Sequence, residues 1–136
     1  MGHQVIAIAV RLVVMGTALG AYYAAIPHLF PDGGSGANIG AGLIAFGVVV
    51  LVSFGWGFVD GRQRGASPTV VTWAVVASAF GLAWLLGLAL VEADDSMSLA
   101  ERLMLDSPIA VFTAGLVLVP AGLGAALGGT AHRPES

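Results

Sequence analysis

Two residues of opposite charge lie within or directly beside long apolar stretches, where burying a charge costs free energy. Arg11 interrupts an apolar stretch, residues 5–26, and Asp60 follows directly on a second one, residues 37–59. A charge at the centre of a membrane-spanning helix costs roughly 2.5–3.5 kcal/mol on insertion scales, so each side chain needs a partner or access to water. Consecutive antiparallel helices would bring the two residues to similar depth. We therefore predict an Arg11–Asp60 ion pair, which either joins the two helices or serves as a gate or ion-binding group.

Two further residues could contribute to a binding site within apolar sequence. Trp84 lies near the middle of a third stretch, residues 69–91, where its ring could face a flat or cationic ligand. Pro120 lies inside a fourth, residues 109–127, and has no N–H to donate to the Leu116 carbonyl. Such breaks expose backbone carbonyls to substrates in transporters, although proline also occurs in membrane helices without that role. The candidate substrate-binding residues are Arg11, Asp60, Trp84 and Pro120.

Other kinds of site lack the residues they need. The chain has no cysteine, and its three histidines, His3, His28 and His132, are far apart in the sequence, so thiolate and histidine-cluster metal sites are not expected. We find no phosphate-binding loop, Ser/His/Asp set or pair of catalytic carboxylates. We therefore expect no enzyme activity, no metal, no cofactor and no nucleic-acid partner.

Composition indicates how these residues must be positioned. Of the 136 residues, 57% are hydrophobic and 10% are charged, against about a quarter charged in soluble domains. A helix needs about 20 apolar residues to cross a bilayer. We predict an all-α membrane protein, one integral membrane domain over residues 1–136 with spans at about 5–26, 37–59, 69–91 and 109–127. The first stretch could instead be a secretory signal, but Arg11 interrupts it and no Lys or Arg precedes it.

Helix boundaries have local signals. Ser67-Pro68 and Ser107-Pro108 each match an N-cap followed by a first-turn proline, which predicts that the third and fourth spans begin there. Ser98 and Glu101 match a capping box. The acidic segment 92–106 around that box predicts a short amphipathic helix on the membrane surface, between the third and fourth spans.

The charges are unevenly distributed between the two sides of a four-span chain. Because arginine in short loops stays on the cytoplasmic side, we expect a multi-pass protein of the cell (plasma) membrane with both termini cytoplasmic. Trp56 and Trp73 flank the arginine-bearing turn. With Trp84 they could line a pocket for a flat or cationic ligand, but their position favours the inner aromatic belt. Four of the five arginines lie on that side: Arg11, Arg62, Arg64 and Arg133. Six of the eight acidic residues lie on the other: Asp32, Glu92, Asp94, Asp95, Glu101 and Asp106.

Small residues recur every fourth position in all four stretches. This spacing lets helix backbones approach closely in a lipid environment. There are more such faces than one four-helix bundle needs, so we expect a homo-oligomer. They are Gly16, Gly20 and Ala24; Gly36 and Gly40; Ser53, Gly57 and Gly61; Ala77 and Gly81; Gly124 and Gly128.

Two segments resemble a known family. They are Trp56-Gly-Phe-Val-Asp-Gly61, at the end of the second span, and Phe112-Thr-Ala with Val119-Pro-Ala-Gly in the fourth. In these, and in length and number of helices, the chain resembles small actinobacterial four-helix membrane proteins classed with the bacterial drug/metabolite transporter superfamily. The resemblance implies export or exchange of a small molecule. Related multidrug exporters use a glutamate in the first helix for proton coupling, and residues 5–26 contain none.

Two functional hypotheses follow. The first is a small-molecule transporter acting as a homo-oligomer, with its site at a subunit interface near the four candidate residues. The alternative is a non-catalytic accessory or scaffold subunit of a larger membrane complex, whose glycine faces dock other subunits. The small number of intramembrane polar groups favours the second hypothesis, because transporters normally carry several.

Overall fold

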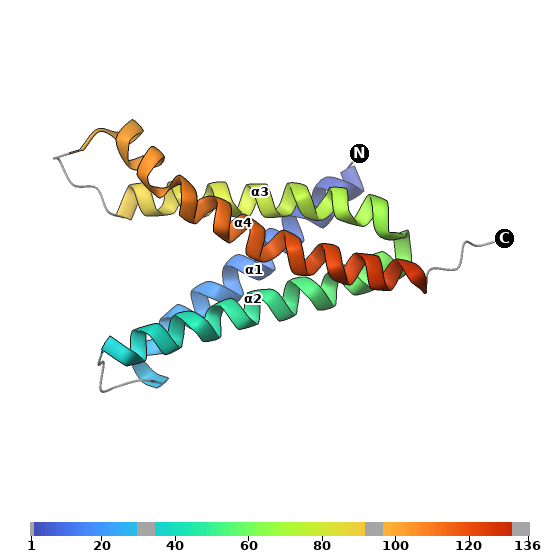
Figure 1. The fold of residues 1–136 in the computed structure, drawn as a ribbon, viewed down its shortest axis with the longest axis horizontal. Coiled ribbons are helices and arrows are strands. Elements are labelled where there is room, and N and C mark those ends of the chain that lie inside the picture. The colour runs from blue at the N-terminus through green and yellow to red at the C-terminus, as the bar shows by residue number, and fades with distance from the viewer. Residues whose placement is uncertain (1, 30–34, 92–96, 132–136) are drawn as a thin grey trace.

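The computed structural model describes residues 2–29, 35–91 and 97–131, and these residues form four helices (Figure 1). Each helix is long and apolar enough to cross a membrane. The predicted all-α fold with four helices suited to crossing a membrane is therefore confirmed. The helices are α1 (Gly2–Leu29), α2 (Ser35–Arg64), α3 (Ala66–Val91) and α4 (Leu99–Thr130).

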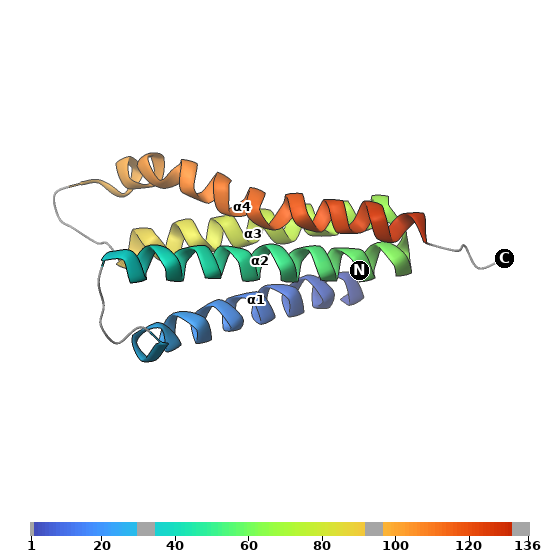
Figure 2. The same cartoon turned by 60° about the horizontal axis from the view of Figure 1, so that its bottom comes forward.

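The four helices alternate in direction. The start of α1, the α2–α3 turn and the end of α4 lie at one end of the bundle, which we call the turn end (Figures 1 and 2). In the described part of the chain, α4 packs against both α2 and α3, while α1 contacts α2 and α3 but not α4. Figure 2 shows α1 as an outer layer next to α2. The chain is thus a tight α2–α3–α4 core with one more loosely attached helix.

The contact between α2 and α4, which run parallel, is made by backbone against backbone. A Cβ atom added at Gly57 or Gly61 would overlap the backbone of α4, and one added at Gly124 or Gly128 would overlap the backbone of α2. Two of the predicted small-residue faces therefore meet each other within one chain. The atoms that these Cβ atoms would meet belong to Ala121, Ala125, Phe54, Phe58 and Arg62.

The α2–α3 turn is a single glycine. Gly65 has a φ of 85°, the left-handed conformation that favours glycine after a helix end, and its N–H donates to the Gly61 carbonyl at 2.9 Å. The next helix begins at once, at Ala66, so the prediction of an N-cap at Ser67 is wrong. Thr69 Oγ1 donates back to the Gly65 carbonyl at 2.8 Å. The turn therefore leaves no loop between the two helices.

Helix α4 begins at the predicted capping box and then continues without a break. The Glu101 N–H donates to Ser98 Oγ, and the Ser98 N–H donates to Glu101 Oε2. A separate surface helix and a new start at Ser107 are not found: residues 99–107 are the first turns of α4. Pro108 has no N–H for the Met104 carbonyl, and the Ser107 hydroxyl donates to that carbonyl instead, at 2.8 Å.

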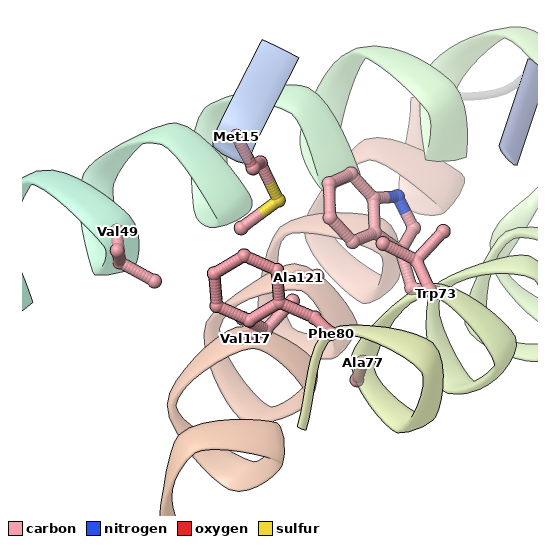
Figure 3. Packing of buried hydrophobic residues seen from close by; sticks show 8 residues of the cluster. Met15, Val49, Trp73, Ala77, Phe80, Val117 and Ala121 are labelled. Atoms are coloured by element: carbon pink, nitrogen blue, oxygen red, sulfur yellow. The ribbon is translucent and has the colours of Figure 1, made fainter. Parts of the chain in front are cut away.

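The apolar core lies where the four helices face one another. In Figure 3, Met15 of α1 points between Trp73 and Phe80 of α3, with Val117 of α4 beneath them. These side chains are at most 8% exposed. Large apolar side chains such as Leu51 and Leu90 are more than two-thirds exposed, a distribution suited to lipid rather than water.

Candidate functional site

The predicted Arg11–Asp60 pair is confirmed. Arg11 lies on α1 and Asp60 near the end of α2, so the two helices bring them together close to the turn end. Arg11 Nη2 lies 2.5 Å and Arg11 Nε 3.2 Å from Asp60 Oδ2. The side chains are 4% and 6% exposed. A buried pair of this kind is strongly destabilised when one partner is removed, because the other charge is then left without compensation.

A third group shares the same carboxylate oxygen. Trp73, which is completely buried on α3, donates its indole N–H to Asp60 Oδ2 at 3.1 Å. The remaining side of the guanidinium is also bonded, since Arg11 Nη1 donates to the Ala7 carbonyl at 2.7 Å. The prediction that Trp73 belongs to an interfacial aromatic belt is therefore wrong: its N–H needs a buried acceptor, and Asp60 supplies one.

Two indole rings flank the guanidinium. The Arg11 Cζ atom lies 5.3 Å from the centre of the Trp56 ring and 5.8 Å from that of Trp73. The two rings meet edge to face, with their centres 6.2 Å apart. Both distances from Cζ are within the range of cation–π attraction. We call Asp60, Trp56 and Trp73 the cation box, in which the guanidinium of Arg11 is the bound cation.

The four candidate residues do not form one site. Trp84 lies about 16 Å beyond Trp73 along α3, at 1.5 Å per residue. There it is half-buried and lines a small, partly open hollow together with residues of all four helices. Pro120 is buried in α4 and borders a different, wider hollow between α2 and α4. The first hollow is lined by Leu19, Ala45, Phe46, Val49, Phe80, Trp84, Thr113 and Leu116.

The apolar core separates this first hollow from the cation box. Val49 and Phe80 line the hollow and also belong to the core cluster that contains Trp73. Met15 completes this barrier from α1, one turn after Arg11 (Figure 3). Along the bundle, the order from the turn end is therefore cation box, apolar barrier, hollow.

For Trp56 and Trp73 the sequence favours the aromatic belt over a pocket for a flat or cationic ligand, and it does not predict their contacts with Arg11 and Asp60. A signal for Trp56 was present, because it precedes Asp60 by one helical turn and so shares its face. For Trp73 the only signal is its position soon after the arginine turn. Ser53, another turn back on the same face of α2, is also fully buried, and its hydroxyl has no hydrogen-bond partner among the described residues.

The described residues contain no group of three or more His, Asp or Glu side chains that could hold a metal ion. Comparisons with protein-family models, with curated proteins and with solved structures find no match to this chain. The resemblance to the small actinobacterial four-helix proteins therefore stays a prediction. The fold and the site define an all-helical protein with four helices suited to crossing a membrane. A buried ion pair joins α1 to α2.

Proposed function

We propose that this protein is a small-molecule transporter of the cell membrane that acts as a homo-oligomer, with both termini in the cytoplasm. The observation that carries the proposal is the buried Arg11–Asp60 pair at the joint between α1 and the core. Charges buried within membrane-spanning segments are expensive, and they commonly mark substrate or ion pathways. This pair lies between the helix with the fewest neighbours and the rigid remainder of the bundle.

In this proposal α1 is the moving part. It contributes Arg11 to the cation box, Met15 to the apolar barrier and Leu19 to the hollow. A displacement of α1 would therefore alter all three in one step. The core can stay fixed meanwhile, because the glycine contacts of α2 and α4 do not involve α1. Motion of one element against a rigid one is the general basis of alternating access.

A second copy of the chain would supply the remaining wall of a pathway. Four helices enclose little space, and the small-residue faces at Gly57 and Gly61 of α2 and at Gly124 and Gly128 of α4 are already used against each other. On α1, an added Cβ at Gly16 or Gly20 would meet nothing within 4 Å. These positions could admit a neighbouring helix closely. The arginines at the α2–α3 turn favour placing the turn end in the cytoplasm.

The test is transport by purified protein in liposomes, followed as transient currents on a supported membrane with guanidinium, tetramethylammonium and ethidium as probes. We expect current with at least one probe, lost in Asp60→Asn and retained in Ser107→Ala, whose hydroxyl is bonded within α4 far from the pair. Equal currents from wild type, Asp60→Asn and empty liposomes would contradict transport.

The tightness of the α2–α4 contact favours a second candidate, an accessory subunit of a larger membrane complex. Where Gly57 and Gly61 meet Gly124 and Gly128, the backbones in contact leave no space between these two helices. Purification in a mild detergent distinguishes the two functions. Other subunits present in fixed ratio, and lost on Gly16→Leu, would favour the accessory role, whereas a pure homo-oligomer would speak against it.

A further inference from the structure

We infer that the cation box is a binding site for a free guanidinium group, and that Arg11 is its built-in competitor. The inference rests on the proposed function for its biological use, but it concerns binding and can be tested without transport. The box is built from α2 and α3, whereas the cation inside it comes from α1. Receptor and ligand therefore belong to different helices of the fold.

The contacts that shape the box do not involve α1. The Trp73 indole N–H fixes Asp60 Oδ2 at 3.1 Å, and the edge-to-face contact of Trp56 with Trp73 orients both rings. Helices α2 and α3 are joined by the single residue Gly65 and are both held by α4. Loss of the guanidinium would thus leave a formed site with an uncompensated carboxylate. Such a site attracts a replacement cation.

The geometry selects the chemistry of that cation. Arg11 presents two N–H groups, from Nε and Nη2, to one carboxylate oxygen. Its guanidinium carbon lies within 6 Å of the centres of both indole rings. A planar cation with N–H groups along its edge and weak hydration meets both requirements, and guanidinium is that cation. Tetramethylammonium has no N–H to donate, and Na⁺ is too strongly hydrated and offers no planar face.

Arg11 lowers the apparent affinity of the box in the intact protein. A free guanidinium can enter only in the fraction of molecules where α1 has withdrawn Arg11, so the apparent Kd is raised by that fraction. The carbonyl that accepts from Arg11 Nη1 belongs to Ala7 of the same helix. A free ligand therefore does not need α1 for its contacts to Asp60 and the rings. Removing the Arg11 side chain should tighten binding.

The experiment measures thermal unfolding of the full chain in detergent during titration with millimolar guanidinium chloride, far below denaturing concentrations. For Arg11→Ala we expect a saturable rise in Tm, with half-saturation at least about tenfold lower than for wild type. NaCl, tetramethylammonium chloride and urea at equal concentration should give no saturable rise. In Arg11→Ala with Asp60→Asn the rise should vanish. A flat response of Arg11→Ala, or an equal response to tetramethylammonium, would overturn the inference.

A variant that does not fold still gives an answer. Recovery of folded Arg11→Ala only when guanidinium is present during purification, and not with the other salts, supports the site. If no salt recovers it, Arg11→Gln, which keeps most of the side-chain volume, takes its place in the same titration, and a flat response there overturns the inference. Guanidinium binding without any transport would contradict the proposed function alone. Guanidinium currents that persist in Arg11→Ala with Asp60→Asn would contradict the site alone.

Discussion

Trp73 and Asp60 are joined by a hydrogen bond of 3.1 Å from the indole N–H to Oδ2, the same oxygen that receives Arg11. The bond links α3 to the end of α2 across the Gly65 turn. The carboxylate is therefore held by α3 as well as by α1, and the same oxygen accepts from both helices.

Removing that indole donor should destabilise the fold. Trp73→Phe keeps an aromatic ring but loses the hydrogen bond to a charged acceptor, which is typically worth about 1.5–3 kcal/mol. Equilibrium unfolding in mixed micelles measures the loss. Trp56→Phe is the matched control, because it keeps a ring beside Arg11 and no bond from Trp56 to Asp60 is described. Equal losses for the two variants would show that the bond contributes nothing of its own.

Breaking the ion pair from one side should cost more than breaking it from both. Arg11→Gln or Asp60→Asn alone leaves a buried charge, and we expect each to lower stability by about 3–5 kcal/mol. The double variant buries no charge, so its loss should be well below the sum of the single losses. A double-mutant cycle of unfolding free energies tests this coupling. Additive losses would mean that the pair does not form.

The parallel α2–α4 contact predicts opposite effects for two neighbouring glycines. A Cβ at Gly124 would overlap the α2 backbone at Phe54 and Phe58, so Gly124→Ala should cost about 1–3 kcal/mol or separate the helices. At Gly122 a Cβ meets nothing within 4 Å, and Gly122→Ala should stabilise the helix by about 0.5–1 kcal/mol. The unfolding midpoints of the two variants, compared with that of the wild type, test this prediction. A destabilised Gly122→Ala with an unchanged Gly124→Ala would refute the pairing of α2 with α4.

The Ser107 hydroxyl should matter only because of Pro108. It donates to the Met104 carbonyl that proline leaves without its usual partner. Ser107→Ala should therefore lose about 0.5–1.5 kcal/mol in the natural sequence and little in a Pro108→Ala background, where the backbone N–H returns. Thermal unfolding of the four proteins gives the comparison. An equal loss of stability in both backgrounds would show that the effect of the Ser107 hydroxyl does not depend on Pro108.

The absence of cysteine from the sequence makes membrane sidedness directly testable. Gln63→Cys at the turn end should react with an impermeant maleimide only after cells are permeabilised. Met97→Cys, placed just before α4 at the opposite end and 49% exposed as methionine, should react in intact cells. The reverse pattern would invert the proposed orientation while leaving the fold unchanged.

The sequence predicted what depends on local pattern. Apolar length predicted four spans, and equal depth in consecutive helices predicted the Arg11–Asp60 pair. The sequence did not predict which distant helices pair. Small-residue spacing indicates that a helix face can pack closely, but not which other face it meets. The parallel contact of Gly57 and Gly61 with α4 is such a case. The helix start expected at Ser107-Pro108 is absent for a local reason. The Ser107 hydroxyl donates to the Met104 carbonyl in place of the N–H that Pro108 lacks.

Helix α4 has 32 residues and is therefore about 48 Å long, whereas a hydrocarbon core is about 30 Å thick. The helix is therefore longer than one crossing requires, and its charged residues, Glu101, Arg102 and Asp106, all lie in its first turns. The same continuous helix thus carries charged residues at one end of the bundle and, near the other end, the glycines Gly124 and Gly128 that contact α2.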